Sequence, residues 1–223
     1  MSRFSTFSGF CVVHCLLGLT LLSGVSHGQT VHLGVLGGGN LSTFQGDTQV
    51  LVENVDFSSL RRRASYQVGG FALFRINDRF ALRSELFYVQ KGAVLEGSNL
   101  GVPEVTGTYR FAYLQAPVLL EVLFPTGGTA TAVVSLGANA SYNTISGVEV
   151  DLPNETRTRN YAPITETFDF GGVIGAGFRY PFDNTLLTFD VRYNPGLSDI
   201  ITSEGVSLRT DSIMLSLGYA FSL

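Results

Sequence analysis

Apolar and polar residues alternate along much of the chain, most plainly between residues 185 and 194. There Leu187, Phe189, Val191 and Tyr193 take one set of alternate positions, and polar or charged residues take the other. A period of two residues is typical of a β-strand with one apolar and one polar face. The pattern recurs along the chain and predicts eight strands, at 30–41, 66–76, 79–91, 108–124, 131–143, 168–180, 185–194 and 210–223.

The predicted connections are alternately short and long. Those after the second, fourth and sixth strands are brief and contain Gly, Asn, Asp or Pro, which favour tight turns. Those after the first, third, fifth and seventh strands are long, at 42–65, 92–107, 144–167 and 195–209. This alternation is typical of an outer-membrane barrel with both termini in the periplasm. We therefore expect an all-β, eight-stranded antiparallel transmembrane up-and-down barrel in the outer membrane of a Gram-negative cell.

Each predicted strand has one apolar face, which we assign to lipid, and one face of polar or small residues, which we assign to the lumen. Aromatic residues of the apolar face concentrate near the strand ends, as in the interfacial girdles of membrane barrels. The expected short-turn girdle comprises Phe74, Phe80, Phe124, Tyr180 and Phe221, and the expected loop-side girdle comprises Tyr66, Tyr88, Tyr142, Phe168 and Tyr193.

Pro117 lies in the middle of the fourth predicted strand. Proline cannot donate to the hydrogen-bond ladder, and a closed barrel has no edge strand, so we expect a bulge or a local opening there. A bulge would change which side chains between Tyr113 and Glu121 face the lumen.

The first 28 residues have the pattern of an export signal. Arg3 is followed by an apolar run at 10–22, and Ser26-His27-Gly28 forms a small-x-small cleavage site. We predict a cleaved signal peptide at 1–28 and a single barrel domain at 29–223. Both cysteines lie within the predicted signal, so the mature chain would have no disulfide and no thiolate metal site.

Composition excludes several functional classes. The net charge of −4 does not fit a nucleic-acid-binding domain, which is normally basic. His32 is the single histidine left after the predicted cleavage, so we expect no histidine-dependent catalysis. Loop carboxylates such as Glu149 and Asp151 are expected to be solvated, without calcium-loop spacing. The glycine runs at 37–39 and 171–177 lack nucleotide-loop spacing, and we interpret them as sites of strand bending or close lumen packing. We predict no enzymatic activity, no cofactor and no metal.

Charged residues on the polar faces are the best candidate for a functional group of side chains. Burial in a narrow lumen requires charges to pair, and an eight-stranded barrel is just wide enough for side chains to fill. We expect a structural network of salt bridges and hydrogen bonds, with a proton or ion path as the alternative. The set is Arg83, Glu85, Glu121, Asp169, Arg179, Asp190 and Arg192.

A second group of charges, Arg61-Arg62-Arg63, lies in the first long connection. We expect a solvated cluster there, with contact to lipid phosphates or to an acidic partner as the alternative.

Five short motifs resemble those of the PorT-like outer-membrane β-barrel family, and their order and spacing carry the resemblance. They are SELFYVQKG at 84–92, YLQAPVLL at 113–120, GAGF at 175–178, DVRY at 190–193 and LGYAF at 217–221. The resemblance implies an eight-stranded outer-membrane barrel and supplies no catalytic residues. Some members of that family are associated with protein-secretion machinery.

The leading hypothesis is a monomeric, non-enzymatic outer-membrane barrel. Its surface loops would bind an unidentified protein or ligand, or it would support envelope integrity or protein secretion. Its expected partners are outer-membrane lipids and the barrel-assembly machinery, and no nucleic acid. Two alternatives stay open: a narrow pore, and a soluble periplasmic β-barrel whose apolar faces point inward around an apolar ligand.

Overall fold

The computed structural model describes residues 30–46, 56–99, 102–152, 155–160, 165–201 and 207–223. The predicted signal peptide lies outside these residues and stays a prediction. Among the described residues, no helix is long and apolar enough to cross a membrane. The strands there are β1 (Val31–Gly46), β2 (Asp56–Arg75), β3 (Phe80–Lys91), β4 (Ala93–Asn99), β5 (Val102–Pro125), β6 (Thr131–Leu152), β7 (Glu155–Asn160), β8 (Phe168–Phe182), β9 (Thr185–Pro195) and β10 (Leu208–Ser222).

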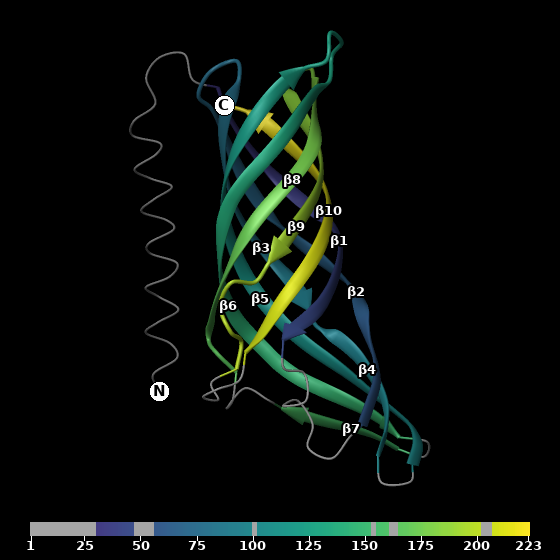
Figure 1. Ribbon diagram of the computed structural model, residues 1–223. Coiled ribbons are helices and arrows are strands. Elements are labelled where there is room, and N and C mark those ends of the chain that lie inside the picture. Colours follow the sequence, from purple (N-terminus) through teal and green to yellow (C-terminus); the bar gives the residue numbers. More distant parts are fainter. Residues whose placement is uncertain (1–29, 47–55, 100–101, 153–154, 161–164, 202–206) are drawn as a thin grey trace. The chain divides into compact units, whose positions relative to one another are not determined.

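Eight of these strands close into an antiparallel ring (Figure 1). The order around the ring is β1, β2, β3, β5, β6, β8, β9 and β10. The ring closes because β10 pairs with β1, in a register that runs from His32 opposite Ser222 to Gly46 opposite Leu208. The predicted up-and-down barrel is therefore confirmed.

Three tight turns join β2 to β3, β5 to β6 and β8 to β9, as expected. In the first, the Asn77 side-chain oxygen accepts the backbone N–H groups of Arg79 at 2.8 Å and Phe80 at 2.9 Å. The second turn uses Gly127 at a φ of 79°, and the third uses Asp183 at a φ of 51°. These turns lie at the end of the barrel that carries the C-terminus (Figure 1).

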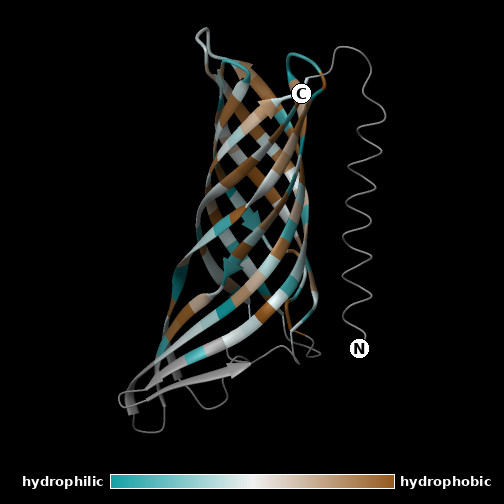
Figure 2. Cartoon of the chain, turned by 180° about the vertical axis from the view of Figure 1, so that it is seen from behind, coloured by the Kyte–Doolittle hydropathy of each residue, from teal (hydrophilic) through white to brown (hydrophobic). Residues whose placement is uncertain are grey.

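Side chains along the wall point alternately outward and inward, and the outward set is the apolar one. In β8 the outward Phe170, Ile174 and Phe178 are each more than half exposed, whereas Asp169 and Arg179 are buried. Hydrophobic residues dominate the part of the barrel nearer the short turns, and hydrophilic ones the opposite end (Figure 2). This distribution matches a lipid-facing band.

Members of both predicted girdles lie on the outer wall. Tyr180 and Phe221 are exposed near the short turns, and Tyr66 is exposed toward the loops. Tyr142 differs, because it is buried and packs edge-to-face on the ring of Phe168 at 5.6 Å.

The strands continue beyond their predicted ends on the loop side. β2 begins at Asp56, β5 begins at Val102 and β6 ends at Leu152, well past the expected limits. β4 and β7 lie wholly within segments that were expected to be loops. β4 pairs with β2 and β5, and β7 pairs with β6. These parts form a strand extension, which we define as β4, β7 and the adjoining ends of β2, β5 and β6; β4 and β7 lie at the end of the barrel opposite the C-terminus (Figure 1).

Pro117 causes a local opening and not a bulge. It lies opposite Asn139, within a stretch of β5–β6 pairing that keeps one register from Tyr113 to Pro125. On the β3 side, Val118 pairs with Ser84 and Gln115 pairs with Phe87, and the residues between them are unpaired. The register is the same before and after this gap. The inward direction is therefore kept through this part of β5.

The bulge in this region lies elsewhere, where the β5–β6 register shifts between Ala112 and Tyr113. The extra residue on β6 is Thr144, whose hydroxyl donates to the Ala112 carbonyl at 2.9 Å. A polar side chain therefore satisfies the backbone at the irregular position.

Candidate functional site

Six buried charged side chains meet inside the barrel, and we call them the lumen charge network. They come from four strands, two of which stand on opposite sides of the ring. Each is at most 3% exposed. The members are Arg83 and Glu85 of β3, Glu121 of β5, Arg179 of β8, and Asp190 and Arg192 of β9.

Asp190 is the centre of the network. Its carboxylate oxygens lie 3.0 Å from Nη1 of Arg83, 2.8 Å from Nη2 of Arg179 and 3.2 Å from Nη2 of Arg192. Charge-assisted contacts of this kind are stronger than neutral hydrogen bonds. One carboxylate therefore links arginines from three strands.

The two glutamates complete the pairing. Glu85 lies 2.5 Å from Nε of Arg83 and 2.7 Å from Nη1 of Arg192. Glu121 accepts two hydrogen bonds from Arg179, one of them from Nε at 3.2 Å. Three arginines face three carboxylates, so the network is neutral. Neutrality matters because an unpaired charge in a poorly solvated lumen is very costly.

Glycines in β8 make room for the network. A Cβ atom on Gly175 would lie 2.7 Å from Cγ of Arg192, and one on Gly177 would lie 2.7 Å from a carboxylate oxygen of Asp190. Side chains at these inward positions would therefore collide with the charged groups. This geometry confirms the interpretation of the 171–177 run as close lumen packing.

Asp169, the seventh predicted member, lies apart from the network. Its carboxylate accepts hydrogen bonds from Ser198 at 2.8 Å and from Thr210 at 3.3 Å. Lys91 is also fully buried, with Nζ 5.5 Å from the ring centre of Tyr113. The period-two pattern places Lys91 on the polar face of its strand with Arg83 and Glu85, although it is not in the predicted set.

A neutral polar layer also fills the lumen. Gln115 donates to the side-chain oxygen of Asn139 at 3.1 Å and to Ser141 at 2.8 Å. Asn139 in turn donates to Asn194 at 3.0 Å. These residues were on the predicted polar faces, but only charged groups were singled out as candidates.

Apolar inward residues were missed by sequence reasoning. Phe71 lies under the guanidinium of Arg83, whose Cζ is 4.0 Å from the ring centre, in a cation–π contact. Phe87 and Val89 are buried on the inward face of β3. Phe87 and Val89 are in phase with Arg83 and Glu85, so the period of two could have placed them inward, but their apolar character fits a lipid-facing position equally well.

Two hollows lie in the described part of the barrel, one next to the network and one on the outer wall. A cavity of about 110 Å³ near the short turns is lined by His32, Arg75 and Arg179 among others. His32 contacts the Ser222 hydroxyl there at 3.1 Å. Among the described residues, no group of three or more His, Cys, Asp or Glu side chains could hold a metal ion.

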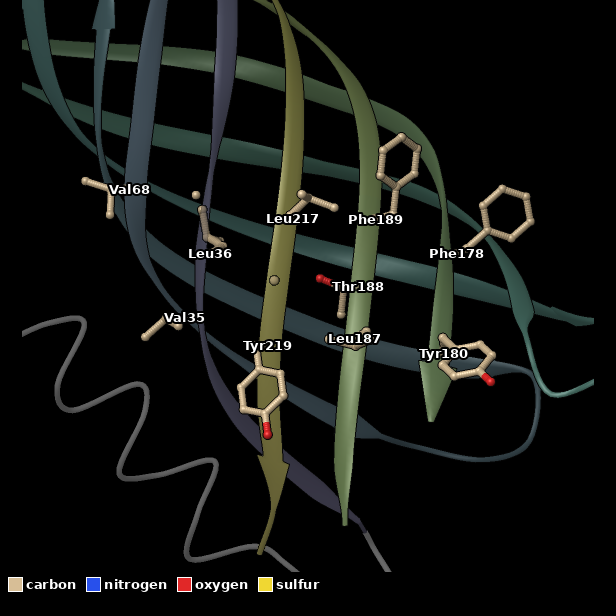
Figure 3. A pocket seen from close by; sticks show the side chains of 12 residues that line it. Val35, Leu36, Val68, Phe178, Tyr180, Leu187, Thr188, Phe189, Leu217 and Tyr219 are labelled. Carbon is tan, nitrogen blue, oxygen red and sulfur yellow. The ribbon is translucent and has the colours of Figure 1, made fainter. Parts of the chain in front are cut away.

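The second hollow lies on the outer wall and has a volume of about 530 Å³. Figure 3 shows Val35, Leu217 and Phe189 among its lining side chains. Its lining is almost wholly apolar, without the converging polar groups that fix a small ligand. It is therefore part of the lipid-facing wall.

The strands form a closed antiparallel ring with an apolar outer wall and a polar lumen. Short turns lie at one end of the ring and long connections at the other. These features define an integral outer-membrane β-barrel. The chain belongs to the family described as the outer membrane protein beta-barrel domain, whose model matches residues 26–202. The protein is thus a β-barrel of the Gram-negative outer membrane. The family consists mainly of non-enzymatic barrels.

Similar solved structures include three outer-membrane proteins. Neisserial surface protein A is 18% identical, with 85% of this chain and 96% of that chain covered and a TM-score of 0.46. OprG from Pseudomonas aeruginosa is 13% identical, with 87% and 95% covered and a TM-score of 0.46. The outer membrane protease OmpT from Escherichia coli is 7% identical, with 87% and 97% covered and a TM-score of 0.44. No curated protein matches the chain in sequence.

Proposed function

We propose that this protein is a non-enzymatic, PorT-like barrel with a closed lumen, which presents its strand extension to a partner outside the cell. The observation that carries the proposal is the pair of ionic contacts across the lumen. Arg83 lies 3.0 Å from Asp190, and Glu85 lies 2.7 Å from Arg192. Both contacts join β3 to β9, which are four positions apart in a ring of eight strands.

Contacts between opposite strands favour a plug over a narrow pore. Side chains that meet from both sides of an eight-stranded barrel fill its cross-section. The layer of Gln115, Asn139 and Asn194 adds a second polar obstruction. The network is neutral, and each charged group in it has an oppositely charged neighbour, so it has no excess charge to attract an ion.

The direction of the side chains argues against a soluble barrel with a ligand inside. Val35, Leu136 and Leu217 point outward and are each more than 60% exposed. A wall of such residues exceeds the apolar patches that soluble monomers normally expose. Lipid is the surrounding that this wall fits.

The strand extension is a preformed surface, which supports a role in binding. Ion pairs between neighbouring strands help to fix it: Arg61 with Glu96 at 2.6 Å, and Arg110 with Glu149 at 2.6 Å. A surface that is ordered before binding loses less entropy when a partner docks. A protein or ligand bound there would connect the barrel to secretion or to envelope integrity.

Planar-bilayer recording tests the closed lumen. The mature protein, refolded and inserted, is expected to show no discrete conductance steps in conditions where a general porin does. Stepwise conductance of the wild-type protein would overturn the plug and favour the pore.

Photo-crosslinking on whole cells tests the binding surface. A crosslinking residue at position 61, in the extension, is expected to give a defined adduct, and the same residue at position 183, in a short turn, is expected to give none from outside. Equal yields at the two positions, or none at 61, would overturn the proposed platform.

A further inference from the structure

The three successive arginines of β2 have different surroundings. Arg61 pairs with Glu96 at 2.6 Å, and Arg62 lies 3.6 Å from a carboxylate oxygen of Asp211. Two of the three guanidinium groups are therefore matched by a carboxylate.

Arg63 has only a neutral partner among the described residues. Its Nη2 donates to the side-chain oxygen of Gln90 at 3.1 Å. Its Nη1 is buried and has no hydrogen-bond partner within the described part of the chain. Because a guanidinium has five N–H donors and a fixed charge, this arrangement leaves unused donors beside an uncompensated charge.

Arg63 lies directly beyond the loop-side girdle, on the outer wall. Gln90, its partner, also donates to the Tyr88 hydroxyl at 3.2 Å. The rings of Tyr88 and Tyr66 are 6.1 Å apart, and Tyr66 is exposed on the same wall as Val68. Aromatic girdles mark the level of lipid headgroups, so the guanidinium stands where headgroups begin.

Arg110 supplies a second guanidinium on the same wall. It points outward because its neighbours Tyr109 and Phe111 are buried on the inward face. Arg62 pairs with Ala93, and a Cβ on Gly92 would lie 3.5 Å from Cα of Arg110. Gly92 therefore lies between Arg63 and Arg110, and its φ of 150° favours the residue without a side chain.

The electrostatics agree with this proximity. Arg63 lies outside the lipid-spanning band, and its own burial, followed by the Arg110 guanidinium, lowers its pKa. Arg110 itself pairs with Glu149 at 2.6 Å. Among the described side chains of this wall, Arg61 pairs with Glu96 and Arg110 pairs with Glu149, so the positive charge of Arg63 has no carboxylate partner there.

We propose that Arg63, with Arg110 beside it across Gly92, binds a phosphate group of an outer-leaflet lipid. The planar guanidinium matches the oxygens of a phosphate and binds them through two parallel N–H groups. The acyl part of the same lipid would lie along Tyr66 and Val68, which are exposed on the wall below. This site adjoins the partner surface proposed above, because the Arg110–Glu149 pair also belongs to that surface, but lipid binding there does not require the partner.

Lipid binding by two matched variants tests this site. The mature protein in detergent micelles is titrated with diphosphorylated lipid A, with dephosphorylated lipid A and with inorganic phosphate, and bound ligands are counted by native mass spectrometry. The variants are Arg63→Gln and Arg61→Gln, which remove the same charge two residues apart. Heat-modifiable gel migration verifies that each variant is folded.

The expected result is that Arg63→Gln binds the phosphorylated lipid about tenfold more weakly, as the loss of a charge-assisted contact predicts. Arg61→Gln should bind within about twofold of wild type, because its guanidinium already pairs with Glu96. Dephosphorylated lipid should bind the wild-type protein as weakly as phosphorylated lipid binds the Arg63 variant.

Three outcomes would overturn the assignment. Equal affinity of Arg63→Gln and wild type would remove Arg63 as the binding group. Equal losses in both variants would indicate unspecific attraction to the wall. Binding of inorganic phosphate as tight as that of the lipid would indicate a free-anion site without a lipid.

Discussion

Neutralising Asp190 tests how much the lumen charge network stabilises the barrel. Asp190→Asn keeps a carbonyl oxygen but removes the charge that faces three arginines at 2.8, 3.0 and 3.2 Å. Three arginines would then face two carboxylates in a lumen where each group is at most 3% exposed. Removing one partner of such a buried set costs about 3–5 kcal/mol.

The side-chain oxygen of the introduced asparagine can still accept a hydrogen bond from an arginine. The expected decrease in the free energy of unfolding is therefore at the lower end of this range, about 3 kcal/mol. The assay is urea unfolding of the refolded protein in lipid vesicles, followed by circular dichroism and heat-modifiable gel migration. Asp183→Asn is the matched control, because Asp183 lies in an exposed turn at a φ of 51° that asparagine tolerates. Its effect should stay within about 0.5 kcal/mol.

A double variant separates charge balance from lost contacts. Asp190→Asn combined with Arg179→Gln restores neutrality, with two arginines and two glutamates remaining. The double variant should be more stable than the sum of the two single losses by about 1–3 kcal/mol. The reasoning would be refuted if Asp190→Asn lost less than about 1 kcal/mol, or if the two losses simply added.

Other parts of the barrel give further expectations. Gly177→Ala places a Cβ atom against the backbone oxygen of Phe189 and should cost about 1–3 kcal/mol in vesicle unfolding. Gly39→Ala should be nearly neutral, because a Cβ atom there would have no neighbour within 4 Å. The Arg61 hydrogen bond lowers the pKa of Glu96, so the pair should stabilise the extension above the unfolded pKa and stop doing so as pH falls through the folded pKa. The protection factors of the β4 amides, which are corrected for the intrinsic pH dependence of exchange, should therefore fall in acid, and protection factors that do not change with pH would contradict the pairing. Leu136→Arg, on the lipid face, should lower unfolding free energy by about 2–4 kcal/mol, and a silent substitution would contradict the membrane assignment.

Alternation was enough to predict the barrel because lipid and lumen impose opposite demands on successive residues. All eight strands of the ring, including Thr185–Pro195, lie where the period-two pattern placed them. Outside the membrane, lipid no longer requires every second residue to be apolar. β7 has the sequence ETRTRN, in which both faces are polar, so backbone pairing forms a strand that hydrophobic patterning does not reveal.

The candidate site was predictable as a set of charges but not as an arrangement. The faces placed all seven predicted charged residues on the inward side, where they are buried. Asp169 nevertheless binds Ser198 and Thr210, outside the network, because position along the strand decides which inward groups meet. Contacts such as Arg83 with Asp190 also require knowledge of which strands lie opposite each other, and local sequence does not contain it.

The partners of the network come from strands far apart in the chain, and this has a consequence for assembly. Arg83 and Asp190 are 107 residues apart and meet only when β3 and β9 face each other. In an open sheet these charges would be separated within a membrane that penalises each of them. Pairing of the lumen charges therefore stabilises the closed ring relative to the open sheet. The joining of β1 to β10 and the pairing of these charges become one cooperative event. The same residues that obstruct the lumen thereby act as an internal check that the barrel has closed in register.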